Sequence, residues 1–369
     1  MYGCDNMWLM ILGLVMIAFI LGVIYLVKKV SNFVLIIKVS KNKKSLKELI
    51  SFMTILIVFL VLRFTLSLVN AIIILLHVAL FFIIYGLIFR VIKKLRSKEF
   101  KFYYQGWFSL LTVIIYLSIG FYLCHNVWQT NYVVKTNKDV RLRIALIADS
   151  HIGTTFDGEG FKKYAKRIEE QKPDMVVIAG DYVDDSTKKK DLEKATKYLG
   201  KIKTKYGIFY SYGNHDEGYF NKRDFTKEEL KSILEKNNIN ILADEVKLID
   251  NFYVIGRKDK SLGNRKEMSE LVNKLDKDKY KIVIDHEPND YDNEEKSDVD
   301  LVLSGHTHGG QLFPISQIGG LFFKANDKTY GYERRGSTDF IVTSGISDWE
   351  LDFKTGTKSE YVIIDVKQK

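Results

Sequence analysis

The residue types in this chain that are best suited to chemistry are histidine, aspartate and asparagine side chains that directly follow short apolar runs. Five of the seven histidines lie in such segments. The segments are Asp149-Ser150-His151, Gly180-Asp181, Gly213-Asn214-His215-Asp216, Asp285-His286-Glu287 and Gly305-His306-Thr307-His308. A single Asp after a strand is commonly a turn or cap residue, and a single His is commonly a packed side chain. Five such segments in order favour a shared site instead.

Imidazole and carboxylate groups without thiolates are typical ligands of first-row divalent metals, so the set favours manganese, iron or zinc over calcium. The glycines at 305, 309 and 310 let the backbone bend close to an ion. A carboxylate such as Asp181 can bridge two ions, which lie about 3.5–4 Å apart in two-metal hydrolytic sites. The chemistry that these residues indicate is metal-assisted hydrolysis at phosphorus.

The apolar runs that precede these segments are predicted to be short buried strands. From Arg141 onward, eight runs alternate with helix-like segments at 161–171, 190–203, 226–237 and 264–277. The runs lie at 143–149, 175–181, 207–216, 252–257, 281–287, 300–308, 339–345 and 361–366. Strands that are apolar on both faces indicate a layered α/β domain. Because ligands bind beyond the carboxyl ends of strands in such domains, we expect the five segments to converge on one site.

The ordered series D-x-H, G-D, G-N-H-D, H and G-H-x-H resembles the calcineurin-like metallophosphoesterase superfamily over roughly residues 141–366. GHTHGGQ at 305–311 and HEP at 286–288 are similar to the bacterial YkuE-type branch, whose members are often membrane-attached or exported. The resemblance implies a four-layer α/β/β/α metallophosphoesterase sandwich with the metals at one edge.

The resemblance also implies a role for each matching residue. The implied ligands of two divalent ions are Asp149, His151 and His308 for the first, Asn214, His286 and His306 for the second, and Asp181 between both. His215 would be the proton donor or transition-state stabiliser, and Asp184 would orient it. Manganese is the expected metal, with iron and zinc as alternatives.

Two departures narrow the resemblance. In the protein serine/threonine phosphatases of this superfamily, Arg-Gly follows the position of Asp184 and Glu follows Gly-Asn-His, whereas this chain has Asp185-Ser186 and Asp216. That subfamily is therefore disfavoured. The stretch after Gly345 also lacks the Pro/Arg-rich segment expected of YkuE-type relatives.

The first 130 residues are predicted to be a transmembrane anchor of four helices, at about 7–27, 47–69, 70–92 and 107–127. Residues 7–27 form an uncharged apolar run, and a bilayer core of about 30 Å needs about 20 apolar residues. The apolar stretch from Leu49 to Ile92 would be about 66 Å long as one helix, so it is expected to fold back near Ser67–Asn70. Residues 131–140 are predicted to be a linker, and 141–369 the metallophosphoesterase domain.

The charges of the connecting segments predict an orientation in the cell membrane. Residues 28–47 carry seven lysines and 90–101 carry six basic residues, while the turn between the two middle spans carries none. The positive-inside rule places both basic loops in the cytoplasm, and four spans then make the domain extracytoplasmic. If Leu49–Ile92 spanned only once, the domain would be cytoplasmic.

Composition excludes several other classes of protein. Two cysteines rule out a disulfide framework and a cysteine-rich zinc module. Residues 1–140 contain 16 basic and four acidic residues, and the remainder contains 39 basic and 41 acidic, so no nucleic-acid partner is expected of the domain.

The function that these observations predict is a membrane-anchored phosphoesterase, in which a metal-bound hydroxide attacks phosphomonoesters or phosphodiesters. The expected partners are the lipid bilayer and a phosphorylated substrate, with lipid and cell-envelope components as candidates. The alternative is a membrane receptor or sensor that binds a phosphorylated ligand without turnover. A transporter is disfavoured because the four spans contain no repeat or paired charges.

Overall fold

The structure is a computed structural model, and it describes residues 2–96, 100–218, 223–313 and 326–369. The chain divides into two compact units, Met1–Ile119 and Gly120–Lys369. Each unit has its own core, and each is described separately below.

The first unit is helical. Its helices are α1 (Tyr2–Val30), α2 (Val34–Val39), α3 (Lys44–Thr65), α4 (Leu68–Arg96) and most of α5 (Tyr104–His125). A small core of Leu26, Ile55, Leu75, Ala79 and Phe82 holds α1, α3 and α4 together. The chain folds back between α3 and α4, where the hydroxyl of Ser67 accepts a hydrogen bond from the Asn70 amide (3.1 Å). The predicted turn therefore lies at the start of α4.

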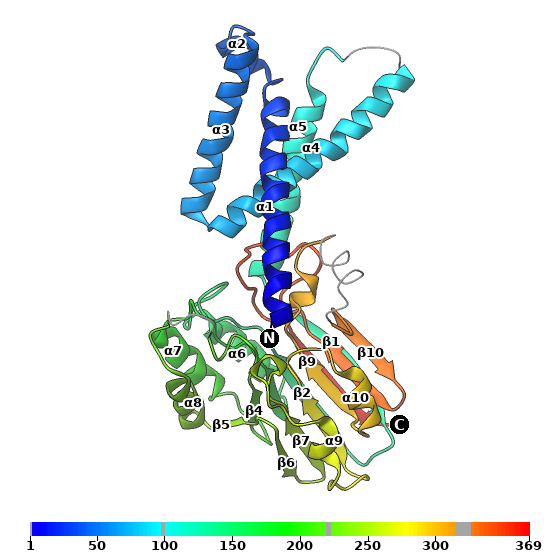
Figure 1. Cartoon of the computed structure of the whole chain (residues 1–369). Helices are drawn as coiled ribbons and strands as arrows, with labels where there is room; N and C mark the ends of the chain where they lie inside the picture. Colours follow the sequence, from blue (N-terminus) through cyan, green and yellow to red (C-terminus); the bar gives the residue numbers. More distant parts are fainter. Residues whose placement is uncertain (1, 97–99, 219–222, 314–325) are drawn as a thin grey trace. The chain divides into compact units, whose positions relative to one another are not determined.

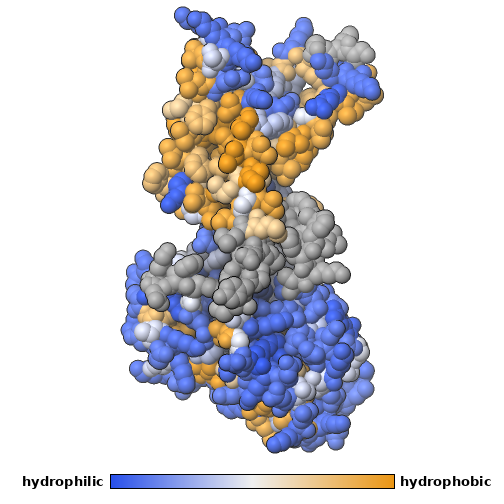
Figure 2. Space-filling view, in the orientation of Figure 1, coloured by the Kyte–Doolittle hydropathy of each residue, from blue (hydrophilic) through white to orange (hydrophobic). Residues whose placement is uncertain are grey.

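Among the described residues, four helices are long and apolar enough to cross a membrane, and they are Leu12–Val30, α3, α4 and α5. This confirms the four predicted apolar helices. Most of their large apolar side chains are exposed, as the orange surface over these helices shows in Figure 2. Exposed apolar surface on this scale is typical of lipid-facing helices rather than of a water-soluble bundle.

The second unit contains two six-stranded sheets (Figure 1). The first has the order β1 (Trp128–Thr136), β12 (Glu360–Gln368), β2 (Leu142–Ile147), β3 (Met175–Ala179), β4 (Ile208–Ser211) and β5 (Ile239–Ile241). The second has the order β10 (Gly331–Arg335), β11 (Thr338–Val342), β9 (Leu301–Ser304), β8 (Tyr280–Ile284), β7 (Phe252–Gly256) and β6 (Glu245–Ile249).

The two sheets pack face to face, with helices on their outer faces. Leu146, Val177 and Leu303 belong to the apolar layer between the sheets. Helices α6 (Phe161–Glu170), α7 (Lys189–Leu199) and α8 (Lys227–Lys236) cover the first sheet, and α9 (Met268–Val272) and α10 (Tyr291–Lys296) cover the second. The predicted four-layer α/β/β/α sandwich is confirmed.

The prediction that residues 131–140 form a linker is wrong, because residues 128–136 form strand β1 at the edge of the first sheet. It pairs in parallel with β12 over its whole length, from Trp128 opposite Glu360 to Thr136 opposite Gln368. Most of its side chains are partly buried or exposed, so its sequence lacks the continuous apolar character of the inner strands. The second unit therefore begins before residue 131, within the last two turns of α5.

Candidate metal centre

The five motif segments converge because the strands before them run in parallel. Strands β2, β3 and β4 are parallel neighbours in the first sheet, and β8 and β9 are parallel neighbours in the second. Their carboxyl ends therefore meet at one end of the sandwich. Four of these strands, β2, β3, β8 and β9, are each followed two positions later by a motif residue, namely Asp149, Asp181, His286 and His306. Backbone hydrogen bonds tie the loops together, from Asp149 to Gly180 (3.1 Å) and from Gly305 to His286 (3.0 Å).

A first cluster contains Asp149, His151 and His308, whose ligand atoms all lie within 4.8 Å of one another. The imidazoles of His151 and His308 stack with their centroids 5.2 Å apart. Each has a carboxylate behind its Nδ1, namely Asp184 Oδ2 at 3.2 Å from His151 and Asp348 Oδ1 at 3.1 Å from His308. This directs both Nε2 atoms toward the centre of the cluster. Carboxylate–histidine pairs of this kind are common behind metal ligands, because they fix the ring and make it more basic.

A second cluster contains Asp181, His286 and His306, again with ligand atoms within 4.8 Å of one another. Nδ1 of His286 donates to the carbonyl of Ala179 (2.7 Å), which leaves Nε2 facing Asp181 Oδ2 at 3.1 Å. Nδ1 of His306 lies 3.1 Å from Asn214 Oδ1. The structure thus brings Asn214 beside this cluster, as its predicted role as a ligand requires, and that role stays a prediction.

Asp181 lies between the two clusters. Its Oδ2 is 3.1 Å from Nε2 of His286 and 3.8 Å from Nε2 of His151. Its burial would raise the pKa of this carboxyl, but the neighbouring His286 and His151 hold it well below its usual range. Burial lowers the pKa of His306 to about 3, and His286 adds to this effect. The environment therefore favours an ionised Asp181 beside a neutral His306. Burial opposes the charged form of His286 and His151, but the neighbouring carboxylates raise the pKa of both, so each of these imidazoles must lose a proton to bind a cation.

The hydrogen bonding indicates that cations fit here. Nε2 of His151 and Nε2 of His286 are buried without a hydrogen-bond partner among the described atoms, although each faces Asp181. A buried polar atom that lacks a partner is costly, and a cation between the nitrogen and the carboxylate would satisfy both groups. The nitrogen and oxygen donors, without thiolates, fit first-row divalent ions.

The backbone of the centre is strained. Five non-glycine residues of the clusters adopt left-handed φ values, and they are Asp149 (52°), His151 (35°), Asp181 (51°), His306 (71°) and His308 (48°). Such conformations cost energy and concentrate at functional sites. At Gly213, a Cβ atom would lie 2.3 Å from Asp181 Oδ1, so only glycine lets this loop approach the carboxylate.

His215 lies next to the first cluster. Its ring centroid is 5.2 Å from that of His151 and 4.7 Å from that of Trp349. Its backbone amide donates to Asp181 Oδ1 (2.9 Å), which fixes this loop to the centre. Burial lowers the pKa of His215 to about 4. Its predicted catalytic role remains a prediction.

The predicted role of Asp184, which is to orient His215, stays a prediction, and the structure adds a contact of its carboxylate with His151. Oδ2 lies 3.2 Å from Nδ1 of His151, and Oδ1 accepts hydrogen bonds from the amide (2.8 Å) and hydroxyl (2.7 Å) of Ser186. Both oxygens of Asp184 are therefore engaged. Its proximity in sequence to Asp181 suggested a role at the centre, but not which histidine it contacts.

Sequence reasoning missed Asp348 and Trp349, which lie in the loop after β11. Asp348 is fully buried, and its Oδ1 accepts a hydrogen bond from Nε2 of Gln311 (2.6 Å) in addition to facing His308. Trp349 packs on His215. The feature of the sequence that could have identified them is the end of the strand at Val342, because it brings the following loop to the same edge as the five motifs.

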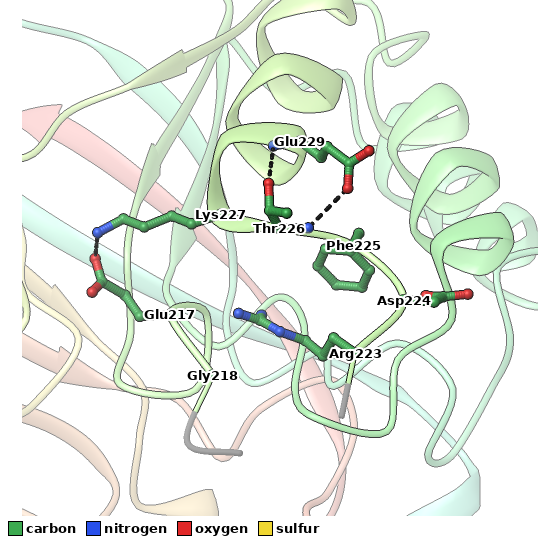
Figure 3. A pocket seen from close by; sticks show the side chains of 8 residues that line it. All are labelled: Glu217, Gly218, Arg223, Asp224, Phe225, Thr226, Lys227 and Glu229. Atoms are coloured by element: carbon green, nitrogen blue, oxygen red, sulfur yellow. Dashed lines mark hydrogen bonds and ion pairs between the residues drawn. The ribbon is translucent and has the colours of Figure 1, made fainter. Parts of the chain in front are cut away.

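The last residue of the Gly-Asn-His-Asp motif has a structural role. Asp216 accepts four backbone hydrogen bonds, from the amides of residues 181, 182, 183 and 213, and so joins two ligand-bearing loops. Its own carbonyl accepts from Nη1 of Arg223 (2.8 Å). Figure 3 shows the pocket beside this loop, in which Arg223 extends toward Gly218 and Lys227 pairs with Glu217. Because acidic and basic side chains alternate around it, this pocket has no clear preference for an anion.

A two-sheet sandwich with clustered His and Asp residues at its strand ends is the arrangement expected of a metallophosphoesterase. Comparison with known proteins agrees, since the calcineurin-like phosphoesterase family matches residues 142–310. An uncharacterized metallophosphoesterase of Aquifex aeolicus is 32% identical over 251 residues, which cover 64% of this chain and 91% of that protein. The chain belongs to the calcineurin-like phosphoesterase family.

Two further relatives are informative. The metallophosphoesterase YkuE of Bacillus subtilis is 27% identical over 236 residues, 61% of this chain and 79% of that protein. A transmembrane protein with a metallophosphoesterase domain from Danio rerio is 27% identical over 287 residues, 70% of this chain and 63% of that protein. The family implies hydrolase activity, and the similarity to YkuE agrees with the predicted branch.

Proposed function

We propose that this protein is a membrane-anchored phosphoesterase that hydrolyses phosphomonoesters or phosphodiesters with two divalent metal ions. The observation that carries the proposal is the pair of clusters joined by Asp181, in which buried nitrogens of His151 and His286 face its carboxylate and have no hydrogen-bond partner in the described part of the chain. Manganese is the metal we expect, because imidazole and carboxylate ligands without thiolates suit it.

Two such ions supply an activated water and neutralise the charge that develops on phosphorus. The residues of the chain hold the ions and orient the groups around them. Asp184 and Asp348 keep the imidazoles of His151 and His308 turned into the first cluster. His215 lies beside that cluster, and we assign it hydrogen-bond donation to a phosphoryl or leaving-group oxygen. Trp349 packs on the His215 ring.

The test uses the full chain, purified in detergent and loaded with Mn²⁺. We expect two ions per chain by elemental analysis, together with hydrolysis of p-nitrophenyl phosphate or bis(p-nitrophenyl) phosphate. A chelator should remove both properties, and Mn²⁺ should restore them. Two bound ions with saturable binding of a phosphate ester and no turnover would favour the receptor alternative.

We also propose that the catalytic domain is extracytoplasmic, because the two basic loops are the cytoplasmic ones by the positive-inside rule. The test is cysteine labelling of intact cells in a variant that lacks Cys4 and Cys124. A cysteine in place of the exposed Ser337 should react with a membrane-impermeant maleimide, whereas one in place of the exposed Ser45 should react only after lysis. The opposite pattern would make the domain cytoplasmic.

A further inference from the structure

The last two turns of the apolar helix α5 are hydrogen-bonded to the loop 345–359 of the catalytic unit. The amide of Lys354 donates to the carbonyl of Gly120 (3.0 Å), and the amide of Ser359 donates to that of Leu123 (3.0 Å). The hydroxyl of Ser359 also donates to the carbonyl of Cys124 (2.7 Å). Gly120 to Lys369 form one compact unit, so the end of this helix is part of the catalytic unit.

The same loop reaches the metal centre. Asp348 is fully buried, and each of its two carboxylate oxygens faces a different partner. Oδ1 lies 3.1 Å from Nδ1 of His308, and Oδ2 lies 3.8 Å from the thiol sulfur of Cys124. A single side chain therefore separates the last turn of a membrane-spanning helix from a candidate metal ligand.

Large apolar side chains are exposed on both sides of this connection. On α5, Phe121 and Tyr122 are 44% and 58% exposed, and on the loops beside the centre Trp349 and Phe313 are 39% and 52% exposed. The Phe313 amide donates to the hydroxyl of Thr355 (3.0 Å), which ties this aromatic residue to loop 345–359. We call these four residues the aromatic rim. Exposed aromatics at the end of a span are typical of the membrane interface.

From this connection we infer that the metal centre opens at the bilayer surface and that its substrate is the phosphate ester of a membrane lipid. The inference rests on the proposed function and specifies its substrate class. The end of a span lies at the edge of the hydrocarbon core, and the centre is fixed beside that end. A lipid headgroup can therefore reach the centre while its acyl chains stay in the bilayer along the aromatic rim. Removing a lipid from the bilayer would expose its acyl chains to water, and this arrangement avoids that cost.

The experiment compares lipid and water-soluble forms of the same headgroups. The Mn²⁺-loaded full chain is reconstituted in phosphatidylcholine vesicles that contain phosphatidic acid or phosphatidylglycerol. The soluble counterparts are glycerol 3-phosphate and glycerophosphoglycerol at equal bulk concentration. We expect at least one lipid to be hydrolysed about tenfold or more faster than its counterpart, a ratio that corresponds to 1.4 kcal/mol. The rate should also fall when phosphatidylcholine dilutes the lipid in the surface at constant bulk concentration.

Equal rates for lipid and counterpart, or a rate that ignores surface dilution, would overturn the inference and leave the proposed function intact. Hydrolysis of p-nitrophenyl esters without hydrolysis of either lipid would have the same meaning. Failure to hydrolyse any of these esters with both metals bound would overturn the proposed function as well.

A rim variant tests the route of the lipid. Phe313→Ala removes an exposed aromatic ring from the rim, and we expect the ratio of lipid to soluble hydrolysis to fall about three- to tenfold, as loss of a partly buried apolar contact predicts. The matched control is Leu248→Ala on the edge strand β6, where an apolar side chain is 53% exposed. An equal fall of the ratio in both variants, or no fall in Phe313→Ala, would contradict the role of the rim.

Discussion

The two clusters of the candidate metal centre differ in what supports their imidazoles. In the first cluster, the carboxylates of Asp184 and Asp348 lie behind His151 and His308. In the second, the partner of His286 is the backbone carbonyl of Ala179, at the end of β3. The first cluster therefore depends on charged side chains from two separate loops, whereas in the second cluster His286 is held by the backbone of the sheet and His306 lies beside the uncharged side chain of Asn214. A single substitution can remove the support of the first cluster but not that of His286.

The largest effect is expected from Asp181→Asn, because this residue faces both clusters. Neutralising it removes the negative charge between two cations, which then repel each other with less compensation. We expect the metal content to fall in both clusters and turnover to fall by more than about 10³-fold, beyond the 10–100-fold typical of residues behind a ligand. Elemental analysis and a kinetic assay on the same preparation test this. Normal turnover with two bound ions would exclude Asp181 as the bridge.

The substitution His215→Ala distinguishes an effect on metal binding from an effect on turnover. The imidazole packs on His151 and Trp349 and belongs to neither cluster, so both ions should stay bound. Loss of a proton donor or of a transition-state hydrogen bond lowers turnover by about 10²–10⁴-fold. The measurement is kcat at saturating Mn²⁺ together with metal stoichiometry. If the variant loses metal instead, His215 is a ligand and the assignment is wrong.

Asp348→Asn and Asp184→Asn test the difference between the clusters directly. Each keeps the shape of the side chain but removes the charge that supports an imidazole of the first cluster. Such changes typically cost 10–100-fold in metal affinity. We expect the affinity for only one of the two ions to fall. The measurement is a Mn²⁺ titration in which binding is followed by electron paramagnetic resonance.

The control for both variants is Asp365→Asn, in which the carboxylate pairs with Arg143 (2.8 Å) away from the strand ends that carry the centre. It should bind both ions as the unchanged chain does. Equal weakening of both ions in Asp348→Asn would mean that the two clusters are not supported independently.

The strands that could be predicted from the sequence are those inside the sheets. Among the strands that the structure describes, all eight predicted ones are interior, and the four that were missed are edge strands, namely β1, β5, β6 and β10. An interior strand such as β3 is buried on both faces and reads as a continuous apolar run. An edge strand such as β10 alternates between partly buried and exposed residues, and its sequence Gly-Tyr-Glu-Arg-Arg resembles a loop.

The site shows the same division. His and Asp residues that directly follow a buried strand could be identified, because the strand locates them at the sheet edge. Asp348 follows its strand by six residues, and its contact with His308 depends on how loop 345–359 folds. The contact of Asp184 with His151 likewise depends on side-chain geometry that spacing does not encode.

The smallest expected effect concerns Gly120, which contacts the first cluster only through loop 345–359. A Cβ atom at Gly120 would lie 2.7 Å from Cγ2 of Thr355, so Gly120→Leu must displace this part of the loop. The neighbouring Lys354 is buried and donates through Nζ to the carbonyls of Ser344 (2.6 Å) and Ser347 (3.2 Å). A displacement at Lys354 is therefore transmitted toward Asp348.

We expect Gly120→Leu to lower the affinity for one Mn²⁺ ion by about two- to tenfold and to leave the affinity for the other unchanged. This loss corresponds to a fraction of the 1–3 kcal/mol that overpacking costs. The matched control is Gly13→Leu in α1, where no heavy atom lies within 4 Å of the new Cβ. Both variants add the same apolar side chain to a helix long and apolar enough to span a membrane, so only the contact with the loop differs. If Gly120→Leu weakened both ions equally, or neither, the first cluster would not depend on the end of α5.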